Sequence, residues 1–233
     1  MGISLLWKAP MVLALVIVPE FIQHIVEIRI GMFESRDAFA ALANDPTRMG
    51  FGYAKLTGLV LTFIAASRFW GARERGVKWY GLSDIDWRRF GLGFLLFGLL
   101  PAAPALVESQ IGETNAQILG MVMTALLLPA LFLMLAGLFG DRTTPARDMW
   151  RRSWTWAILT IGLLLLAFMP AQWLHGMNHH WAMGAHPAIV WALMIFDSIL
   201  VGLLAGLSGT ALYLGYAAFR GQPRPPAASS FPN

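Results

Sequence analysis

The chain has 233 residues, of which 57% are hydrophobic and only 13% are charged, so it has too little polar surface for a water-soluble globule. The formal net charge of +4 comes from small groups of Arg and Lys beside apolar segments, which indicates contacts with lipid headgroups and not with nucleic acid. Because cysteine is absent, disulfides, thiolate metal sites and cysteine nucleophiles are excluded.

Six apolar segments follow one another along the chain, at about residues 10–31, 51–70, 89–108, 117–139, 153–172 and 188–218. Each has the length of a membrane span, and helices are required because an unpaired amide finds no water in hydrocarbon. We therefore expect an all-α, polytopic transmembrane helical bundle of about six spans over residues 1–221, followed by a disordered tail over residues 222–233. Apolar residues after Gly31 also predict a short interfacial helix between the first two spans.

Basic residues predict the orientation of these spans. They gather between spans two and three and between spans four and five: Arg68, Arg73, Arg75, Lys78, Arg88, Arg89, Arg142, Arg147, Arg151 and Arg152. The loops after spans three and five contain neither Lys nor Arg. Because positively charged loops stay on the cytoplasmic side, we expect both termini in the cytoplasm of a bacterial cytoplasmic (inner) membrane.

Ionisable side chains occur within the predicted spans. Glu20, His24 and Glu27 share one face of the first span, at i, i+4 and i+7. At about 1.5 Å per residue, Glu20 and Asp197 both lie about 15 Å deep, and His24 and Lys55 about 8–9 Å deep. Such groups are costly in a bilayer, so this pattern predicts an ion or proton site. In the alternative interpretation, Lys55 neutralises a carboxylate and a protonated Asp197 holds helices together.

Histidines gather after the fifth span, at His175, His179, His180 and His186. The HxxxHH spacing resembles one histidine box of the membrane di-iron desaturases and hydroxylases. That family has several such boxes, whereas this chain has five histidines in all, so we do not carry the family's activity over. A divalent zinc, iron or manganese ion at this outer loop, with Glu27 or Glu108 completing the site, is one interpretation. The other is a hydrated loop without metal.

Small residues in the last span form the GxxxG pattern at Gly202 and Gly206, with Gly209 one turn further on. Such residues let helices approach closely. We expect packing within the chain, with a membrane-protein partner or a second copy of the chain as the alternative.

The sequence leaves three functions open. It contains no phosphate-binding GxxxxGK[ST] loop, no HExxH and no GxSxG, which favours a protein that is not an enzyme. A non-catalytic subunit or assembly factor of a membrane complex is the first interpretation. The others are a small proton- or cation-coupled transporter using Glu20 and Asp197, and a membrane metalloprotein using the histidines.

Overall fold

The computed structural model describes residues 1–221, and every regular element in this part of the chain is helical. Five helices are long and apolar enough to cross a membrane, or six if one bent pair counts as a single span. The protein is therefore a multi-span helical membrane protein. The tail predicted over residues 222–233 lies outside the described residues.

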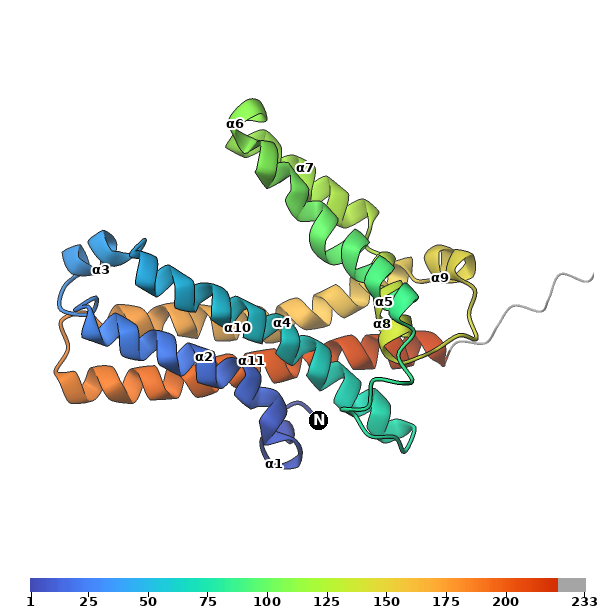
Figure 1. Ribbon diagram of the computed structural model, residues 1–233, viewed down its shortest axis with the longest axis horizontal. Coiled ribbons are helices and arrows are strands. Elements are labelled where there is room, and N and C mark those ends of the chain that lie inside the picture. Colours follow the sequence, from blue (N-terminus) through green and yellow to red (C-terminus); the bar gives the residue numbers. More distant parts are fainter. Residues whose placement is uncertain (222–233) are drawn as a thin grey trace, which may run out of the picture.

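Four long helices lie side by side and form the body of the molecule (Figure 1). They are α2 (Pro10–Arg29), α4 (Pro46–Glu74), α10 (Trp154–Ala182) and α11 (Pro187–Arg220). Helix α11 packs against each of the other three, so it is the centre of the bundle.

Two of these helices are longer than the sequence predicted, and both extensions matter for the site. Helix α4 begins at Pro46 instead of near residue 51, because the Asp45 carboxylate accepts hydrogen bonds from the first free amides, those of Thr47 and Arg48. Helix α10 continues to Ala182 instead of ending near residue 172. It stops only before Gly184, whose φ of 72° turns the chain into α11.

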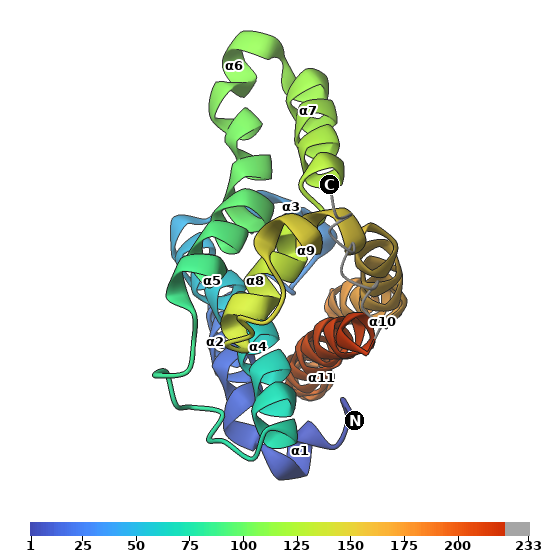
Figure 2. The same cartoon turned by 90° about the vertical axis from the view of Figure 1, so that its right-hand side faces the viewer.

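A helical hairpin leaves this body at an angle (Figures 1 and 2). Its first arm contains α5 (Trp87–Phe94), η1 (Leu95–Leu99), η2 (Leu100–Val107) and α6 (Glu108–Ile111); its second arm is α7 (Glu113–Leu126). The first arm changes from α-helix to π and 3-10 turns because Pro101 and Pro104 have no amide hydrogen to donate.

The segment predicted as one span over residues 117–139 is not a straight helix. Helix α7 ends at Leu126, and α8 (Ala130–Leu138) continues at an angle of 60° after a break that contains Pro129. A proline at this position cannot continue the hydrogen-bond ladder of α7, which explains the bend.

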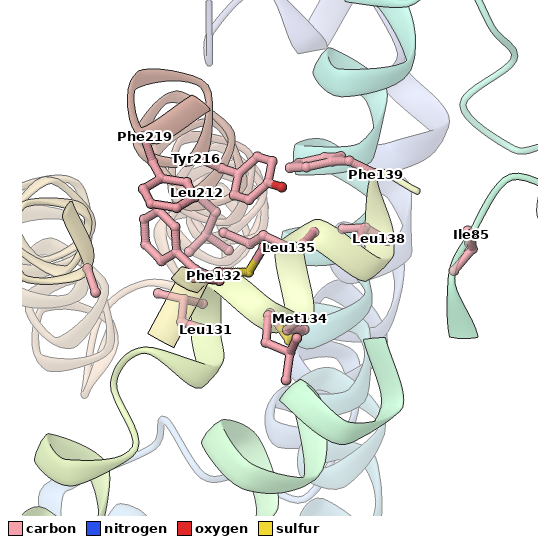
Figure 3. Close-up of a cluster of buried hydrophobic side chains, with 14 residues drawn as sticks. Ile85, Leu131, Phe132, Met134, Leu135, Leu138, Phe139, Leu212, Tyr216 and Phe219 are labelled. Carbon is pink, nitrogen blue, oxygen red and sulfur yellow. The ribbon is translucent and has the colours of Figure 1, made fainter. Parts of the chain in front are cut away.

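Helix α8 is buried and attaches the hairpin to the bundle (Figure 3). Phe132, Leu135 and Phe139 pack against Tyr216 and Phe219 near the end of α11. The ring of Phe132 lies edge-on to that of Phe219, with centroids 5.1 Å apart. This cluster fixes the base of the hairpin to α11, while the tip of the hairpin lies away from the bundle.

Helices α2 and α4 approach each other closely at Gly58. Pro19 has no amide hydrogen, so the Leu15 carbonyl one turn earlier lacks its helical donor. A Cβ atom on Gly58 would lie 2.2 Å from that Leu15 oxygen, so only glycine fits at this crossing. The three glycines singled out in α11 also face neighbouring helices within the chain: Gly202 faces Ile17, Gly206 faces Leu13, and Gly209 faces Phe63 and Ala66.

Short helices complete the structure: α1 (Leu5–Lys8), α3 (Arg36–Leu42) and α9 (Ala146–Arg152). Helix α3 lies in the segment predicted to form a short helix between the first two spans, and the Ser35 hydroxyl caps it by accepting from the Ala38 amide at 3.0 Å. It lies at the end of the bundle where α10 turns into α11 (Figure 1).

Candidate metal centre

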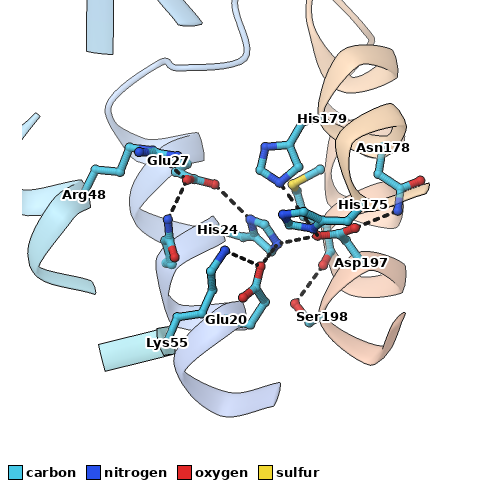
Figure 4. A network of polar contacts seen from close by, with 12 residues as sticks. Glu20, His24, Glu27, Arg48, Lys55, His175, Asn178, His179, Asp197 and Ser198 are labelled. Atoms are coloured by element: carbon cyan, nitrogen blue, oxygen red, sulfur yellow. Dashed lines mark hydrogen bonds and ion pairs between the residues drawn. The ribbon is translucent and has the colours of Figure 1, made fainter. Parts of the chain in front are cut away.

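Six ionisable side chains from three helices meet inside the bundle (Figure 4), and His179 among them contacts Phe39 of α3. They are Glu20, His24 and Glu27 of α2, His175 and His179 of α10, and Asp197 of α11. The three α2 residues share one helix face, as their spacing predicted, and this face is turned toward α11. Glu20, His24, Glu27 and Asp197 are all 0% exposed.

Asp197 lies at the centre of the cluster. Its Oδ2 atom is 3.1 Å from His24 Nε2, 2.6 Å from His175 Nδ1 and 3.7 Å from His179 Nε2. Three imidazole nitrogens therefore surround one carboxylate oxygen. The other oxygen, Oδ1, accepts a hydrogen bond of 2.7 Å from Asn178, which fixes the orientation of the carboxylate.

His24 is held between carboxylates. Its Nδ1 lies 2.9 Å from Glu27 Oε2, and its Nε2 lies 3.3 Å from Glu20 Oε1 as well as next to Asp197. This arrangement suits an imidazolium, or an imidazole that donates from Nδ1 and offers the lone pair of Nε2 to a metal. A carboxylate behind the distal nitrogen is the usual way in which proteins orient a metal-binding histidine.

Two cationic side chains of α4 support the α2 carboxylates. Arg48 Nε donates to Glu27 Oε1 at 2.9 Å, and Gln23 Nε2 donates to the same oxygen at 3.0 Å. Lys55 Nζ donates to Glu20 Oε1 at 3.2 Å. The second oxygen of Glu20, Oε2, is buried and has no hydrogen-bond partner among the described residues. A buried carboxylate oxygen without a partner is costly, so a proton, a water molecule or a metal ion at this atom would stabilise the site.

The charges of the cluster do not balance when all three carboxylates are ionised. Glu20, Glu27 and Asp197 carry three negative charges, whereas Lys55 and Arg48 supply two positive charges. An uncompensated buried charge is unfavourable in a membrane protein. A bound cation or a proton on a histidine would remove this excess.

Aromatic side chains close the cluster on the side of α3. The rings of Phe33 and Phe39 lie 5.6 Å and 6.1 Å from the ring of His179. The side chains of His175 and His179 nevertheless keep 15% and 12% of their surface exposed. The cluster is therefore largely buried, and these two histidines are its most exposed members.

The structure brings Glu20 and Asp197 together, as the depth estimate expected, and gives Lys55 a different partner. Glu20 and Asp197, expected in one layer, both contact His24. Lys55, expected at the depth of His24, contacts Glu20, as in the alternative interpretation in which it neutralises a carboxylate. The histidines do not form a separate outer loop, because the extension of α10 carries His175 and His179 into the bundle.

Two of the four predicted outer histidines lie outside the cluster. His180 Nε2 lies 3.4 Å from the Arg36 guanidinium of α3, and His186 caps α11 by accepting from the Ala188 amide at 3.3 Å. Glu108, considered as a completing ligand, lies exposed in α6 at the tip of the hairpin. Consecutive helix positions such as 179 and 180 point in different directions, which explains why only one of them enters the site.

Arg48, Gln23 and Asn178 were missed in the sequence. Arg48 is seven residues before Lys55 and therefore on the same helix face, but the predicted start of that span excluded it. Asn178 is three residues after His175, a spacing that also places two side chains on one face.

The donor atoms fit a divalent transition metal. Three overlapping triads have all their ligand atoms within 4.8 Å of one another: Glu20, His24 and Asp197; His175, His179 and Asp197; His24, Glu27 and His179. A tetrahedral ion with bonds of 2.0–2.1 Å separates its ligands by about 3.3 Å, close to the 3.1–3.7 Å between Asp197 Oδ2 and the nitrogens of His24 and His179. His175 Nδ1 lies nearer to the same oxygen, at the hydrogen-bond distance of 2.6 Å. Imidazole and carboxylate donors without sulfur suit zinc, iron or manganese.

No protein-family model, curated protein or solved structure matches this chain. A fold in any case hosts many functions, so the inference of function rests on the geometry of the site.

Proposed function

We propose that this protein binds a divalent transition-metal ion inside its membrane-spanning bundle, between α2, α10 and α11. The observation that supports this most strongly is the convergence of three imidazole nitrogens on one carboxylate oxygen of Asp197. In the proposed site His24, His175, His179 and Asp197 are the ligands; they belong to two triads that share Asp197, so their side chains must move closer together to reach one ion. Glu20 supplies a further oxygen, the unpartnered Oε2.

The surrounding residues support the same assignment. Glu27 orients His24, Asn178 orients Asp197, and Lys55 holds Glu20. The Glu27 carboxylate raises the basicity of the His24 imidazole, and all three partners fix the direction of the side chains they contact. A divalent cation would change the formal charge of the cluster from −1 to +1, since Lys55 and Arg48 compensate two of the three carboxylates.

Proton- or cation-coupled transport is the second candidate, because both nitrogens of His24 face carboxylate oxygens. A proton on this ring would balance the cluster without any metal. Glu20 and Asp197 would then exchange that proton at the Nε2 atom of His24, which both carboxylates contact. The two candidates differ in what the purified protein carries: the first requires a metal, and the second does not.

A role as a non-catalytic subunit or assembly factor was favoured by the short loops and by the missing catalytic motifs. It gives no physical reason for six ionisable groups to converge in one buried place. We therefore put metal binding ahead of it.

For the orientation we propose that both termini face the cytoplasm of a bacterial inner membrane. The ends of α4 and α11 and helix α9, which carry the basic groups, lie at the end of the bundle away from α3 (Figure 1). Positive residues favour the cytoplasmic side. The proposed metal site would then lie nearer to the outer face.

Metal binding is tested by competition titration of the metal-free full-length protein in detergent with zinc, manganese and ferrous iron. We expect about one ion per chain, and a loss of at least tenfold in affinity in Asp197→Asn. Asp148→Asn, an exposed carboxylate of α9, is the matched control and keeps the affinity. Circular dichroism and size-exclusion chromatography show that each variant is folded. Folded wild-type protein that binds none of the three ions contradicts the proposal.

A further inference from the structure

A second feature lies apart from the metal cluster: an apolar groove of about 820 Å³ between α4, α5 and the connection that joins them. Figure 2 shows this connection looping outward beside the two helices. Leu56, Val60 and Leu61 of α4 form one wall, and Phe90 and Phe94 of α5 form the other. The volume lies within the range of about 300–1,000 Å³ that is typical of small-molecule sites.

Aromatic residues mark one end of the groove. Trp79, Tyr80 and Trp87 line it, and Tyr80 and Trp87 are 62% and 55% exposed. Tryptophan and tyrosine prefer the headgroup level of a membrane. The opposite end is lined by Leu15 and Leu56, which belong to membrane-spanning segments. The groove therefore extends from the headgroup level into the hydrocarbon layer.

Cationic side chains accompany the aromatic end. The Lys78 ammonium lies 5.9 Å from the centroid of the Tyr80 ring. Arg88 lies in the first turn of α5 next to Trp87, on a different side of the helix from the face that lines the groove. Both are exposed, and neither forms an ion pair with any residue in the range 1–221. They are thus available to an anionic ligand.

Arg68 also lines the groove, but its guanidinium is already occupied. It donates to the carbonyls of Trp79, Gly81 and Leu138 and to the carboxylate of Asp84. It therefore forms part of the wall and holds the α4–α5 connection in place, and the charge available to a ligand belongs to Lys78 and Arg88.

We propose that this groove binds one anionic phospholipid, with an acyl chain along the apolar walls and the phosphate near Lys78 and Arg88. An apolar channel joined to a basic mouth matches the amphipathic shape and the charge of such a lipid. Basic pockets between spans bind acidic headgroups in other membrane proteins. A free phosphate would leave the apolar length of the groove without a partner.

The proposal is tested by native mass spectrometry of the full-length protein, after incubation with equal amounts of phosphatidylglycerol and phosphatidylcholine. Wild-type protein should retain one phosphatidylglycerol in clear preference to phosphatidylcholine. In the double variant Lys78→Gln/Arg88→Gln, the ratio of retained phosphatidylglycerol to phosphatidylcholine should fall by about 30-fold. Leu61→Trp, which fills the groove, should retain neither lipid.

Two controls lie outside the groove: Arg147→Gln on α9, and Leu166→Trp at a 77% exposed position of α10. Both should behave as wild type, and chromatography of every variant reports folding. Equal retention of the two lipids, retention of a neutral isoprenoid in place of phosphatidylglycerol, or unchanged retention in Leu61→Trp would each overturn the proposal. If Leu61→Trp does not fold, the double variant decides: an unchanged lipid preference overturns the proposal.

Discussion

His24 Nε2 and Asp197 Oδ2 lie 3.1 Å apart although 173 positions separate them in the chain. This contact joins α2 to α11, the first and the last of the long helices. The polar cluster therefore lies where two helices that are far apart in the sequence pack together. Substitutions in the cluster should alter both ligand binding and helix packing.

The Glu20–Lys55 pair should be energetically coupled. The two groups are 3.2 Å apart, and Glu20 is fully buried while the Lys55 side chain is 20% exposed. Lys55→Met leaves a buried carboxylate without its cation, whereas Glu20→Gln with Lys55→Met removes both charges. We expect a coupling free energy of about 0.5–3 kcal/mol in a double-mutant cycle measured by unfolding in detergent.

Lys55→Met combined with Asp148→Asn provides the control for this cycle, because Asp148 lies in α9 and not in the cluster. These two substitutions should be additive. If the effects of Glu20→Gln and Lys55→Met on the free energy of unfolding are also additive, the interaction between these two side chains does not stabilise the fold.

The general architecture could be predicted from the sequence, because length and apolar composition determine which segments can cross a membrane. The shared face of Glu20, His24 and Glu27 also follows from helical spacing alone. The site as a whole could not be predicted, because its composition depends on where α4 begins and α10 ends. A capping Asp45 and a turn at Gly184 set those limits, and they bring Arg48, His175 and His179 into the bundle.

Glycine at position 58 should be required for packing. The Leu15 carbonyl oxygen would lie 2.2 Å from a Cβ atom there, and a backbone atom cannot move away cheaply. We expect Gly58→Ala to lower the free energy of unfolding by about 1–3 kcal/mol. A Cβ atom at Gly50, on the same helix, would have no neighbour within 4 Å, so Gly50→Ala serves as the matched control. Equal stability of the two variants would contradict the close α2–α4 approach.

Asp84, in the connection between α4 and α5, should make the stability of the fold depend on pH. Burial raises the pKa of its carboxyl, but the hydrogen bond from Arg68 and the charges of Arg68 and Arg75 outweigh burial and hold the pKa below its ordinary value. A carboxyl with a lowered pKa stabilises the fold at neutral pH and loses this contribution as the pH falls.

Asp84→Asn should therefore lower Tm at pH 7, and the difference from wild type should shrink below about pH 4. Thermal unfolding in detergent between pH 3 and 7 measures this. A difference that is constant over the whole range would mean that the Asp84 charge is not involved.

Glu27 should act on metal binding through His24, which it contacts at 2.9 Å. Glu27→Gln should weaken metal affinity by about 10- to 100-fold while the number of ions per chain at saturation stays the same. Glu34→Gln, an exposed carboxylate just beyond α2, is the control and should bind as wild type. A loss of stoichiometry in Glu27→Gln would instead make Glu27 a direct ligand.

The most direct test of the metal centre compares two adjacent histidines of α10. His179 Nε2 faces Asp197, whereas His180 faces Arg36 of α3. Elemental analysis of purified, folded protein should find about one transition-metal ion per chain in wild type and in His180→Ala, and much less in His179→Ala. Equal metal content in both variants, or none in the wild type, would contradict a metal centre at this place.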